Sequence, residues 1–301
     1  MSDQEYLQDT SNRGLKFRPI PFALLALLIV FLLYQLIGGG ITLFLFGEIP
    51  AASQTLAFRL ITMVAEFAFI LVPALLLTKI QSKDWKHFLR YKKTDWYFIG
   101  LAVVGVISLQ QLLELYLYLQ SLIPLSPTVK EAIRPFQKAI DHTYAILLSA
   151  HSPSDFLFVL AVIAVTPAIC EETLFRGLVQ ANFESSLPKW SAIIWTGVIF
   201  GAYHLDPFSF VALASLGIYL SYLVSATGSI VVPMVAHFTN NFLSALIYYL
   251  WKKDSLVAPS GDTRVSVAYI IEWSIVLVLI FGMTVYLTSN HNKLRQEANQ
   301  P

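Results

Sequence analysis

Residues 164–180, AVTPAICEETLFRGLVQ, place three charged side chains inside an otherwise apolar stretch. An ionisable side chain at the centre of a bilayer costs about 2.5–3.5 kcal/mol on insertion scales, so each one needs a partner or a function. Glu172 and Arg176 are i,i+4 neighbours with the acid first, the favourable order for a helical ion pair. Glu171 points about 100° away around the helix. It has no basic residue at i±3 or i±4, so its partner must come from another helix.

The rest of the chain is apolar in the same way. Of its 301 residues 56% are apolar and 13% are charged, against about 45–50% and about 25% in soluble domains. Eight apolar stretches run over residues 20–36, 58–77, 96–119, 156–180, 190–203, 208–224, 230–250 and 267–287. Because one crossing needs about 20 apolar residues, we expect an all-α, polytopic membrane bundle of about eight transmembrane helices. The fifth and sixth stretches are short, so a pair of partly re-entrant helices fits as well.

Positive charge orients the expected bundle. Residues 79–93 hold six Lys or Arg side chains and a single acid, so the positive-inside rule predicts that this loop is cytoplasmic. Eight crossings return the chain to its starting side. We therefore expect the polar tails at residues 1–19 and 289–301 to be cytoplasmic, in a multi-pass protein of the plasma (inner) membrane.

The segment between residues 124 and 153 carries apolar residues at spacings of three and four, which predicts an interfacial helix. The chain shows no internal repeat and no linker of distinct composition. We therefore treat residues 1–301 as a single membrane domain, with a motif-bearing core at residues 155–250.

Charge and cysteine content exclude several classes of protein. Twenty Lys and Arg residues against nineteen Asp and Glu leave a net charge of +1, which provides no basic field for nucleic acid. A single cysteine, Cys170, excludes an intrachain disulfide and a cysteine-based metal cage. A lone cysteine in an apolar stretch is usually inert packing.

Two further helices carry polar side chains that can converge on Glu171. Residues 200–207, FGAYHLDP, put Phe200 and His204 on one helical face. A later helix carries His237 and Asn241, again at i,i+4. An unpaired carboxylate with two histidines and an asparagine favours a polar catalytic chamber. Three other charged residues in the spans, Arg59, Glu66 and Glu114, are expected to lie near helix ends or to pair across helices.

The chamber has the groups needed to hydrolyse an acyl bond. A carboxylate beside an imidazole can hold and deprotonate water, while an imidazole and a carboxamide can donate hydrogen bonds to an oxyanion. The sequence lacks a Gly-x-Ser-x-Gly elbow, a Gly-x-Gly-Asp motif with a second intramembrane aspartate, and a His-Glu-x-x-His zinc helix.

The predicted helix ends place Glu171 and His204 at different depths in the membrane. Glu171 lies about 13 Å from the end of its span at Gln180, and His204 about 21 Å from the start of the next span at Trp190, at 1.5 Å per residue. Tilting, a kink at Pro167 or a later helix start must absorb this difference.

Three motifs together, Glu-Glu-x-x-x-Arg at residues 171–176, Phe-x-x-x-His at 200–204 and His-x-x-x-Asn at 237–241, resemble the CAAX protease and bacteriocin-processing family. This family, also called CPBP or Abi, includes the Ras-converting CAAX endopeptidases. The resemblance implies an intramembrane endopeptidase with a membrane-tethered peptide or protein as substrate, possible examples being a prenylated C-terminus or a leader peptide.

The resemblance also implies a role for each motif residue. Glu171 is the catalytic glutamate, His204 helps to activate water, and His237 with Asn241 forms the oxyanion hole. The supporting positions fall on three residues, Glu172, Arg176 and Phe200.

The family has been described both as metalloproteases and as glutamate-dependent proteases. Glu171, His204 and His237 could supply a three-ligand zinc site. We favour a protein without a metal cofactor, because an asparagine oxyanion donor is redundant when a metal polarises the carbonyl.

Two alternatives have no protease activity. A membrane immunity or scaffold protein of the bacteriocin-immunity type would need no defined geometry among the motif residues. A transporter would use membrane carboxylates and histidines as proton relays, but it predicts inverted repeats that the sequence lacks. For an enzyme, we expect the chamber to open toward the cytoplasmic side or laterally into the bilayer.

Overall fold

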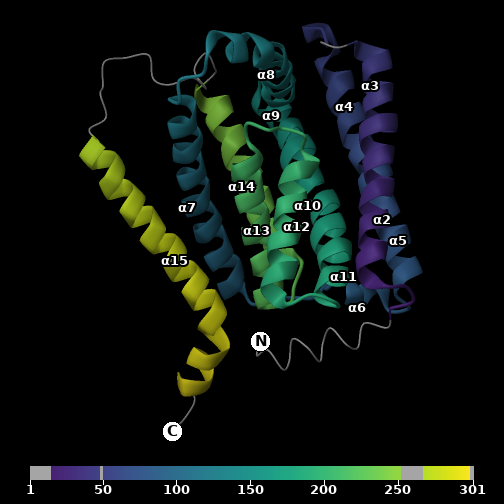
Figure 1. Ribbon diagram of the computed structural model, residues 1–301, viewed down its shortest axis with the longest axis vertical. Coiled ribbons are helices and arrows are strands. Elements are labelled where there is room, and N and C mark those ends of the chain that lie inside the picture. The colour runs from purple at the N-terminus through teal and green to yellow at the C-terminus, as the bar shows by residue number, and fades with distance from the viewer. Residues whose placement is uncertain (1–14, 48–49, 252–266, 299–301) are drawn as a thin grey trace.

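The computed structural model describes residues 15–47, 50–251 and 267–298. Within these ranges every named element is a helix, and the extended pairing is one isolated bridge between Leu15 and Ser82. The predicted N-terminal tail lies outside the described residues up to residue 14. The predicted C-terminal tail is largely helical, because the last helix continues to Ala298. The chain is an all-α membrane bundle (Figure 1).

All eight predicted stretches are helical. In chain order they are α2, η1 and α3 (Pro19–Phe31, Leu32–Gly38, Gly39–Phe46); η2, α4, η3 and α5 (Ala52–Gln54, Thr55–Glu66, Phe67–Leu71, Val72–Gln81); α7 (Trp96–Ser121); α9, η4, α10, η5 and α11 (Pro153–Leu160, Ala161–Val165, Thr166–Glu172, Thr173–Val179, Gln180–Glu184); α12 (Lys189–Tyr203); α13 (Phe210–Thr227); α14 (Val231–Trp251); and α15 (Val267–Ala298). Six of these are long and apolar enough to cross a membrane. The two others are α12, which has 15 residues, and α14, which is interrupted by polar residues such as His237.

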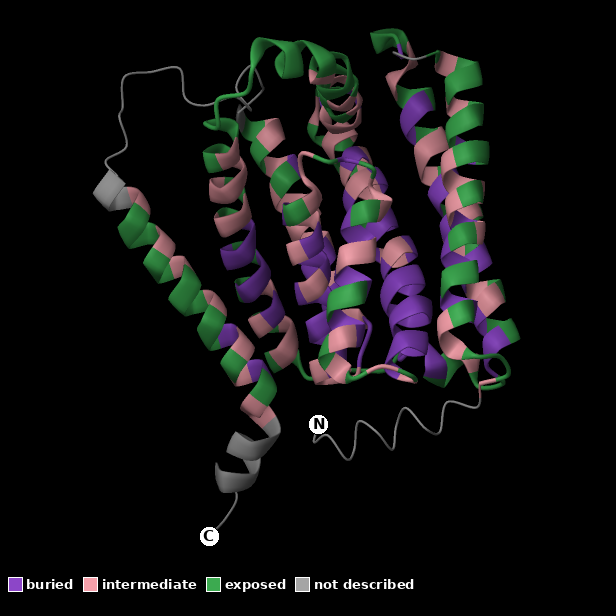
Figure 2. Cartoon of the chain, viewed as in Figure 1, coloured by how far each residue is buried: buried purple, intermediate pink, exposed green. Residues whose placement is uncertain are grey.

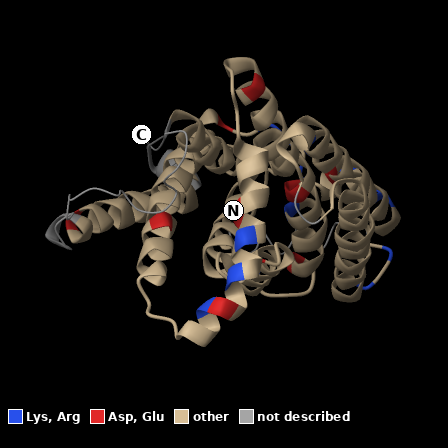
Figure 3. Ribbon diagram, turned by 90° about the horizontal axis from the view of Figure 1, so that it is seen from above, with Lys and Arg blue, Asp and Glu red and all other residues tan. Residues whose placement is uncertain are grey.

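Two helices outside the eight predicted stretches complete the fold. Helix α6 (Trp85–Phe88) lies in the basic loop, and α8 (Pro127–Leu148) occupies the segment predicted to be interfacial. They lie at opposite ends of the bundle, with α8 at the top of Figure 1 and α6 at the bottom. Figure 3 looks onto the α8 end and shows Lys and Arg (blue) gathered on the helix nearest the viewer, with Asp and Glu (red) scattered over an otherwise largely uncharged bundle.

The fourth membrane helix, Pro153–Glu184, contains two π-helical segments that flank the glutamate pair. Pro167 lacks a backbone N–H and would clash with the carbonyl one turn earlier. The π-helical segment η4 directly before it accommodates that mismatch. The hydroxyl of Thr166 donates a 2.7 Å hydrogen bond to the carbonyl of Ala161, five residues back. The helix therefore continues through Pro167 to Glu171 and Glu172.

The lower half of this helix is the packed part of the bundle. Every residue from Glu172 to Glu184 is buried, and Figure 2 shows buried residues gathered around η5 and α11 while α15 is largely exposed. Several polar groups here bond to one another: the Gln180 amide donates to the Glu184 carboxylate and to Ser225, each at 2.9 Å or less. Arg90 from the basic loop forms a 2.8 Å ion pair with Glu184.

Helices α12 and α13 form a tight hairpin that ends below α8 (Figure 1). Their backbones approach closely at Gly197, Gly201 and Gly217. A Cβ at Gly197 would lie 2.4 Å from the backbone of Ile218, and one at Gly201 would lie 2.7 Å from that of Ala214. Small residues four apart allow this approach in membranes. Because α12 is short, its last turn ends inside the bundle.

Candidate active site

A cavity of about 360 Å³ lies inside the bundle beneath α8. Side chains from α4, α8, η4, α10, α12, α13 and α14 line it. All four residues predicted to be catalytic line it together with Phe200: Glu171, His204, His237 and Asn241. The structure thus brings the three motifs to one place.

Glu171 and His204 lie at the same depth. The fourth helix ends at Glu184 rather than at Gln180, so Glu171 is about 20 Å from that end. His204 caps α12, about 22 Å from its start at Lys189. The apparent mismatch came from a helix end placed too early. The His204 Nε2 and Glu171 Oε2 atoms are 4.0 Å apart, a distance that a small movement or a water can bridge.

The orientation of His204 is set by its own helix. Its Nδ1 lies 2.8 Å from the carbonyl oxygen of Phe200. A carbonyl only accepts, so Nδ1 carries the proton and donates. In the neutral ring Nε2, the nitrogen nearer Glu171, is then the acceptor. His204 can therefore accept a proton at this point.

Glu172 belongs to the packed half of the bundle. Its Oε1 accepts from Arg176 Nη1 at 2.9 Å, which confirms the predicted ion pair, and both side chains are fully buried. Arg176 also donates to the carbonyl of Gly217 at 2.9 Å. The ring of Phe200 lies 4.5 Å from the Arg176 guanidinium carbon. This cluster joins the fourth helix to the α12–α13 hairpin.

The same carboxylate orients His237. The Nδ1 of His237 lies 2.8 Å from Glu172 Oε1, and an ionised carboxylate only accepts, so Nδ1 donates. A neutral His237 then offers only an acceptor at Nε2. To donate to an oxyanion the ring must carry a proton on both nitrogens.

Asn241 is held by its neighbours but keeps donor capacity. Its Nδ2 donates to the carbonyl of Ile163 at 2.8 Å, and its Oδ1 accepts from Asn240 Nδ2 at 3.0 Å. A carboxamide has two N–H groups. One N–H of Asn241 is committed, and the other is available to a bound peptide.

A second cavity, of about 440 Å³, adjoins the first. Glu171 and His204 line both, as does Tyr144 of α8. The second is further lined by η1, η3, η5 and other residues of α8, including Phe136. The two cavities therefore flank the Glu171–His204 pair under the cover of α8. The packed residues 172–184 close the end toward the basic loop.

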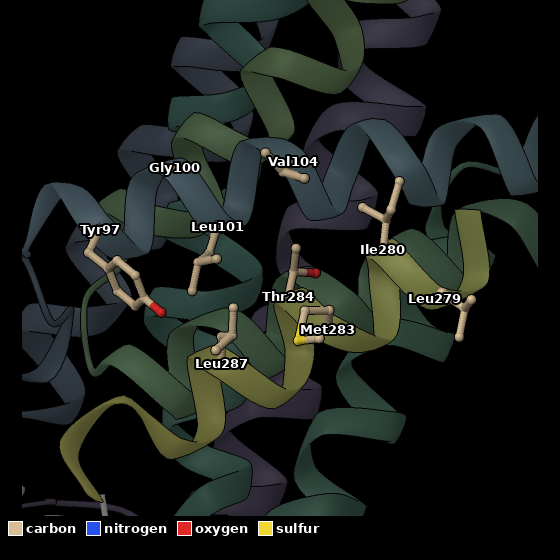
Figure 4. Close-up of a pocket in the computed structure, with 9 residues that line it drawn as sticks. All are labelled: Tyr97, Gly100, Leu101, Val104, Leu279, Ile280, Met283, Thr284 and Leu287. Atoms are coloured by element: carbon tan, nitrogen blue, oxygen red, sulfur yellow. The ribbon is translucent and has the colours of Figure 1, made fainter. Parts of the chain in front are cut away.

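A larger pocket lies elsewhere, between α7 and α15 (Figure 4). Its nine lining residues are nearly all apolar, and Tyr97 and Thr284 supply its hydroxyls. Neither α7 nor α15 lines the cavity of Glu171. This pocket has no group suited to hydrolysis.

The family comparison points to the same segment as the motifs. Residues 153–243 match the family of Rce1-like type II CAAX prenyl endopeptidases. This match confirms the resemblance over the helices that line the first cavity and supports intramembrane endopeptidase activity. Comparisons with curated proteins and with solved structures gave no match.

The residues present do not fit the zinc alternative. Among the described residues no group of three or more His, Cys, Asp and Glu side chains is placed to hold a metal ion. Glu171, His204 and His237 share the cavity without forming such a group. The family match likewise gives no support to the metalloprotease class.

Two polar residues of the cavity that were not predicted as site residues, Tyr144 and Glu66, face the same space as the predicted ones. Tyr144 lines it from α8, and Glu66 lines it from α4. Glu66 was expected to pair across helices, as Arg59 does with Asp155 at 2.9 Å, but its Oε2 atom is buried without a hydrogen-bond partner among the described residues. The sequence did contain a sign that Glu66 lacks a partner on its own helix: like Glu171, it has no basic residue at i±3 or i±4.

Proposed function

We propose that this protein is an intramembrane endopeptidase that hydrolyses a peptide bond in a membrane-associated peptide, with Glu171 and His204 activating the water. The observation that carries this proposal is the 4.0 Å approach of His204 Nε2 to Glu171 Oε2 at the junction of two cavities. Glu171 Oε2 has no hydrogen-bond partner among the described residues. No protein group of the described chain therefore competes with a water for this oxygen.

In the proposed mechanism Glu171 takes a proton from a water held between its carboxylate and His204. The hydroxide attacks the scissile carbonyl, and the oxygen of the tetrahedral intermediate accepts hydrogen bonds from the second N–H of Asn241 and from protonated His237. When the C–N bond breaks, the proton passes from Glu171 to the leaving amine. Water is thereby divided between a new carboxyl group and a new amine.

We also propose that the protein lies in the plasma (inner) membrane with its basic loop and both termini on the cytoplasmic side, by the positive-inside rule. The cavities lie beneath α8, at the other end of the bundle, and residues 172–184 close the basic-loop end. If the basic loop is cytoplasmic, the cavities therefore cannot also open to the cytoplasm. We propose access from the α8 side or laterally, and we abandon the expected cytoplasmic opening.

The test is cleavage by the purified protein in phosphatidylcholine vesicles. A peptide carrying a lipid anchor is expected to be cleaved efficiently, and the same peptide without the anchor poorly, because a soluble peptide must be desolvated to reach Glu171. The Glu171→Gln variant serves as the control for contaminating proteases. Equal cleavage of both peptides contradicts membrane delivery. A folded protein that cleaves no peptide of a broad set favours the immunity or scaffold alternative.

A further inference from the structure

The charge of the cavity lining is one-sided. Among the described residues that line the two cavities, three carry carboxyl groups, Glu66, Glu171 and Asp206, and none is a lysine or arginine. The buried arginines nearby are already bound. Arg59 pairs with Asp155 and with backbone carbonyls, and Arg176 pairs with Glu172.

Of the three carboxyls, Glu66 has no assigned task. Asp206 accepts hydrogen bonds from the backbone N–H groups of Phe208 and Ser209 and so stabilises its own turn. Glu171 faces His204 and is used in the proposed mechanism. Glu66 is 6% exposed, lines the first cavity, and has a buried carboxylate oxygen without a partner.

An unpartnered carboxyl inside a membrane protein is costly unless a ligand supplies its partner. Glu171 does not stabilise an ionised Glu66, since two ionised carboxylates in one cavity repel each other. A lysine ammonium or arginine guanidinium of the substrate can do so, because a charge-assisted hydrogen bond in a dry site is strong.

We propose that the first cavity binds a basic side chain of the substrate, a lysine or arginine within about two residues of the scissile bond, and that Glu66 selects it. This inference rests on the proposed function. A cavity of 360 Å³ is about 7 Å across, and an extended peptide advances about 3.3 Å per residue, which sets the two-residue limit.

The same lining disfavours a substrate cut close to a free C-terminus. A CAAX segment is C-terminal, so its released fragment carries a carboxylate. Neither cavity is lined by a lysine or arginine among the described residues that could receive that group, His237 serves the oxyanion in the proposed mechanism, and Glu66 and Glu171 would repel the carboxylate. The preferred substrate is an internal basic segment of a membrane-anchored peptide.

The experiment uses the full chain in phosphatidylcholine vesicles. The probe is a library of palmitoylated, C-terminally amidated peptides with randomised central positions, and mass spectrometry identifies the cleaved bonds. We expect lysine and arginine to be enriched about tenfold near the cleaved bond, as a charge-assisted hydrogen bond implies, and aspartate and glutamate to be depleted.

Two variants test the assignment to Glu66. Glu66→Gln is expected to yield products without the basic enrichment, whereas Glu114→Gln, the same change on α7 outside the cavity, retains it. Should Glu66→Gln fail to fold, Thr62→Lys places an ammonium one turn from Glu66 in the same cavity. That variant should lose the enrichment as well.

Three results overturn the proposal. The first is a native protein whose products show no enrichment of lysine or arginine. The second is an enrichment that persists in Glu66→Gln or in Thr62→Lys. The third is a folded Glu66→Gln variant that cleaves no peptide, which would mean that Glu66 takes part in the hydrolysis itself. Failure of the proposed function is distinct. The proposed function fails if the Glu171→Gln variant still yields cleavage products, whatever the sequences of those products.

Discussion

Glu171 and Glu172 are adjacent in sequence but face two different halves of the bundle. Glu172 faces the packed half, where its carboxylate is fully buried and is bonded to Arg176 and His237. Glu171 faces the hollow half, where its side chain is 17% exposed and lies 4.0 Å from His204. The rotation of one residue along the helix thus separates Glu172, which stabilises the fold, from Glu171, which can react.

The two halves also differ in how they treat other polar groups. In the packed half, Gln180 and Glu184 bond to each other and to residues of α13 and the basic loop. In the hollow half, Glu66 and Glu171 each keep a buried carboxylate oxygen without a partner among the described residues. Glu172 Oε2 and Gln180 Oε1 of the packed half also lack a partner among those residues, so the hollow half is distinguished by the cavity that Glu66 and Glu171 line, where a substrate or water has room to bind.

The largest effect on stability is expected from breaking the buried pair. Arg176→Ala removes the guanidinium from the buried Glu172 carboxylate and leaves it with His237 alone; breaking a buried ion pair in this way costs about 3–5 kcal/mol. We expect the folded yield in detergent to collapse. Lys83→Ala on the exposed basic loop is the control and should stay within about 0.5 kcal/mol of the native protein. Thermal unfolding followed by size-exclusion chromatography measures both, and equal stability of the two variants would mean that the packed half does not depend on this pair.

A smaller loss is expected where α12 meets α13. Gly197→Ala puts a methyl group 2.4 Å from the backbone of Ile218, so the helices must separate, at about 1–3 kcal/mol. Gly282→Ala on α15 meets no atom within 4 Å and should be neutral or slightly stabilising, since alanine favours helix over glycine. The difference between their melting temperatures is the measurement. If the order is reversed, the hairpin does not pack closely.

The smallest perturbation tests which side the hollow half faces. Ala139→Cys lies on α8 at the second cavity, and Lys83→Cys lies on the basic loop. Both positions are exposed, so each change should cost less than about 0.5 kcal/mol; Cys170 is replaced by alanine in both. A membrane-impermeant maleimide applied to intact cells is expected to label the first cysteine and not the second. Labelling of both, or of Lys83→Cys alone, contradicts the proposed orientation.

Most of the fold could be predicted from the sequence, because apolar length alone decides whether a helix can cross a membrane. The end of the fourth helix could not. The predicted stretch ends at Gln180, yet Asn182 and Glu184 are buried and helical. Their partners, Gln81 and Arg90, come from a segment about a hundred residues earlier, which no local pattern reveals.

The site was predictable where two residues share a helix. The spacing of Glu172 and Arg176 gave their ion pair, and it left Glu171 to find a partner elsewhere. The bond between Glu172 and His237 joins different helices and needed the structure. So did the position of Glu66, which depends on how α4 packs against the fourth helix.

The measurement that tests the account most directly compares Glu171→Gln with Glu172→Gln, scoring cleavage of a lipid-anchored peptide and thermal unfolding in the same preparations. We expect Glu171→Gln to unfold near the native temperature and to lose about 10²–10⁴-fold in cleavage rate, as removal of a general base implies. Glu172→Gln is expected to unfold at a markedly lower temperature. Cleavage at the native rate by folded Glu171→Gln would contradict the assignment of the hollow half as the active site.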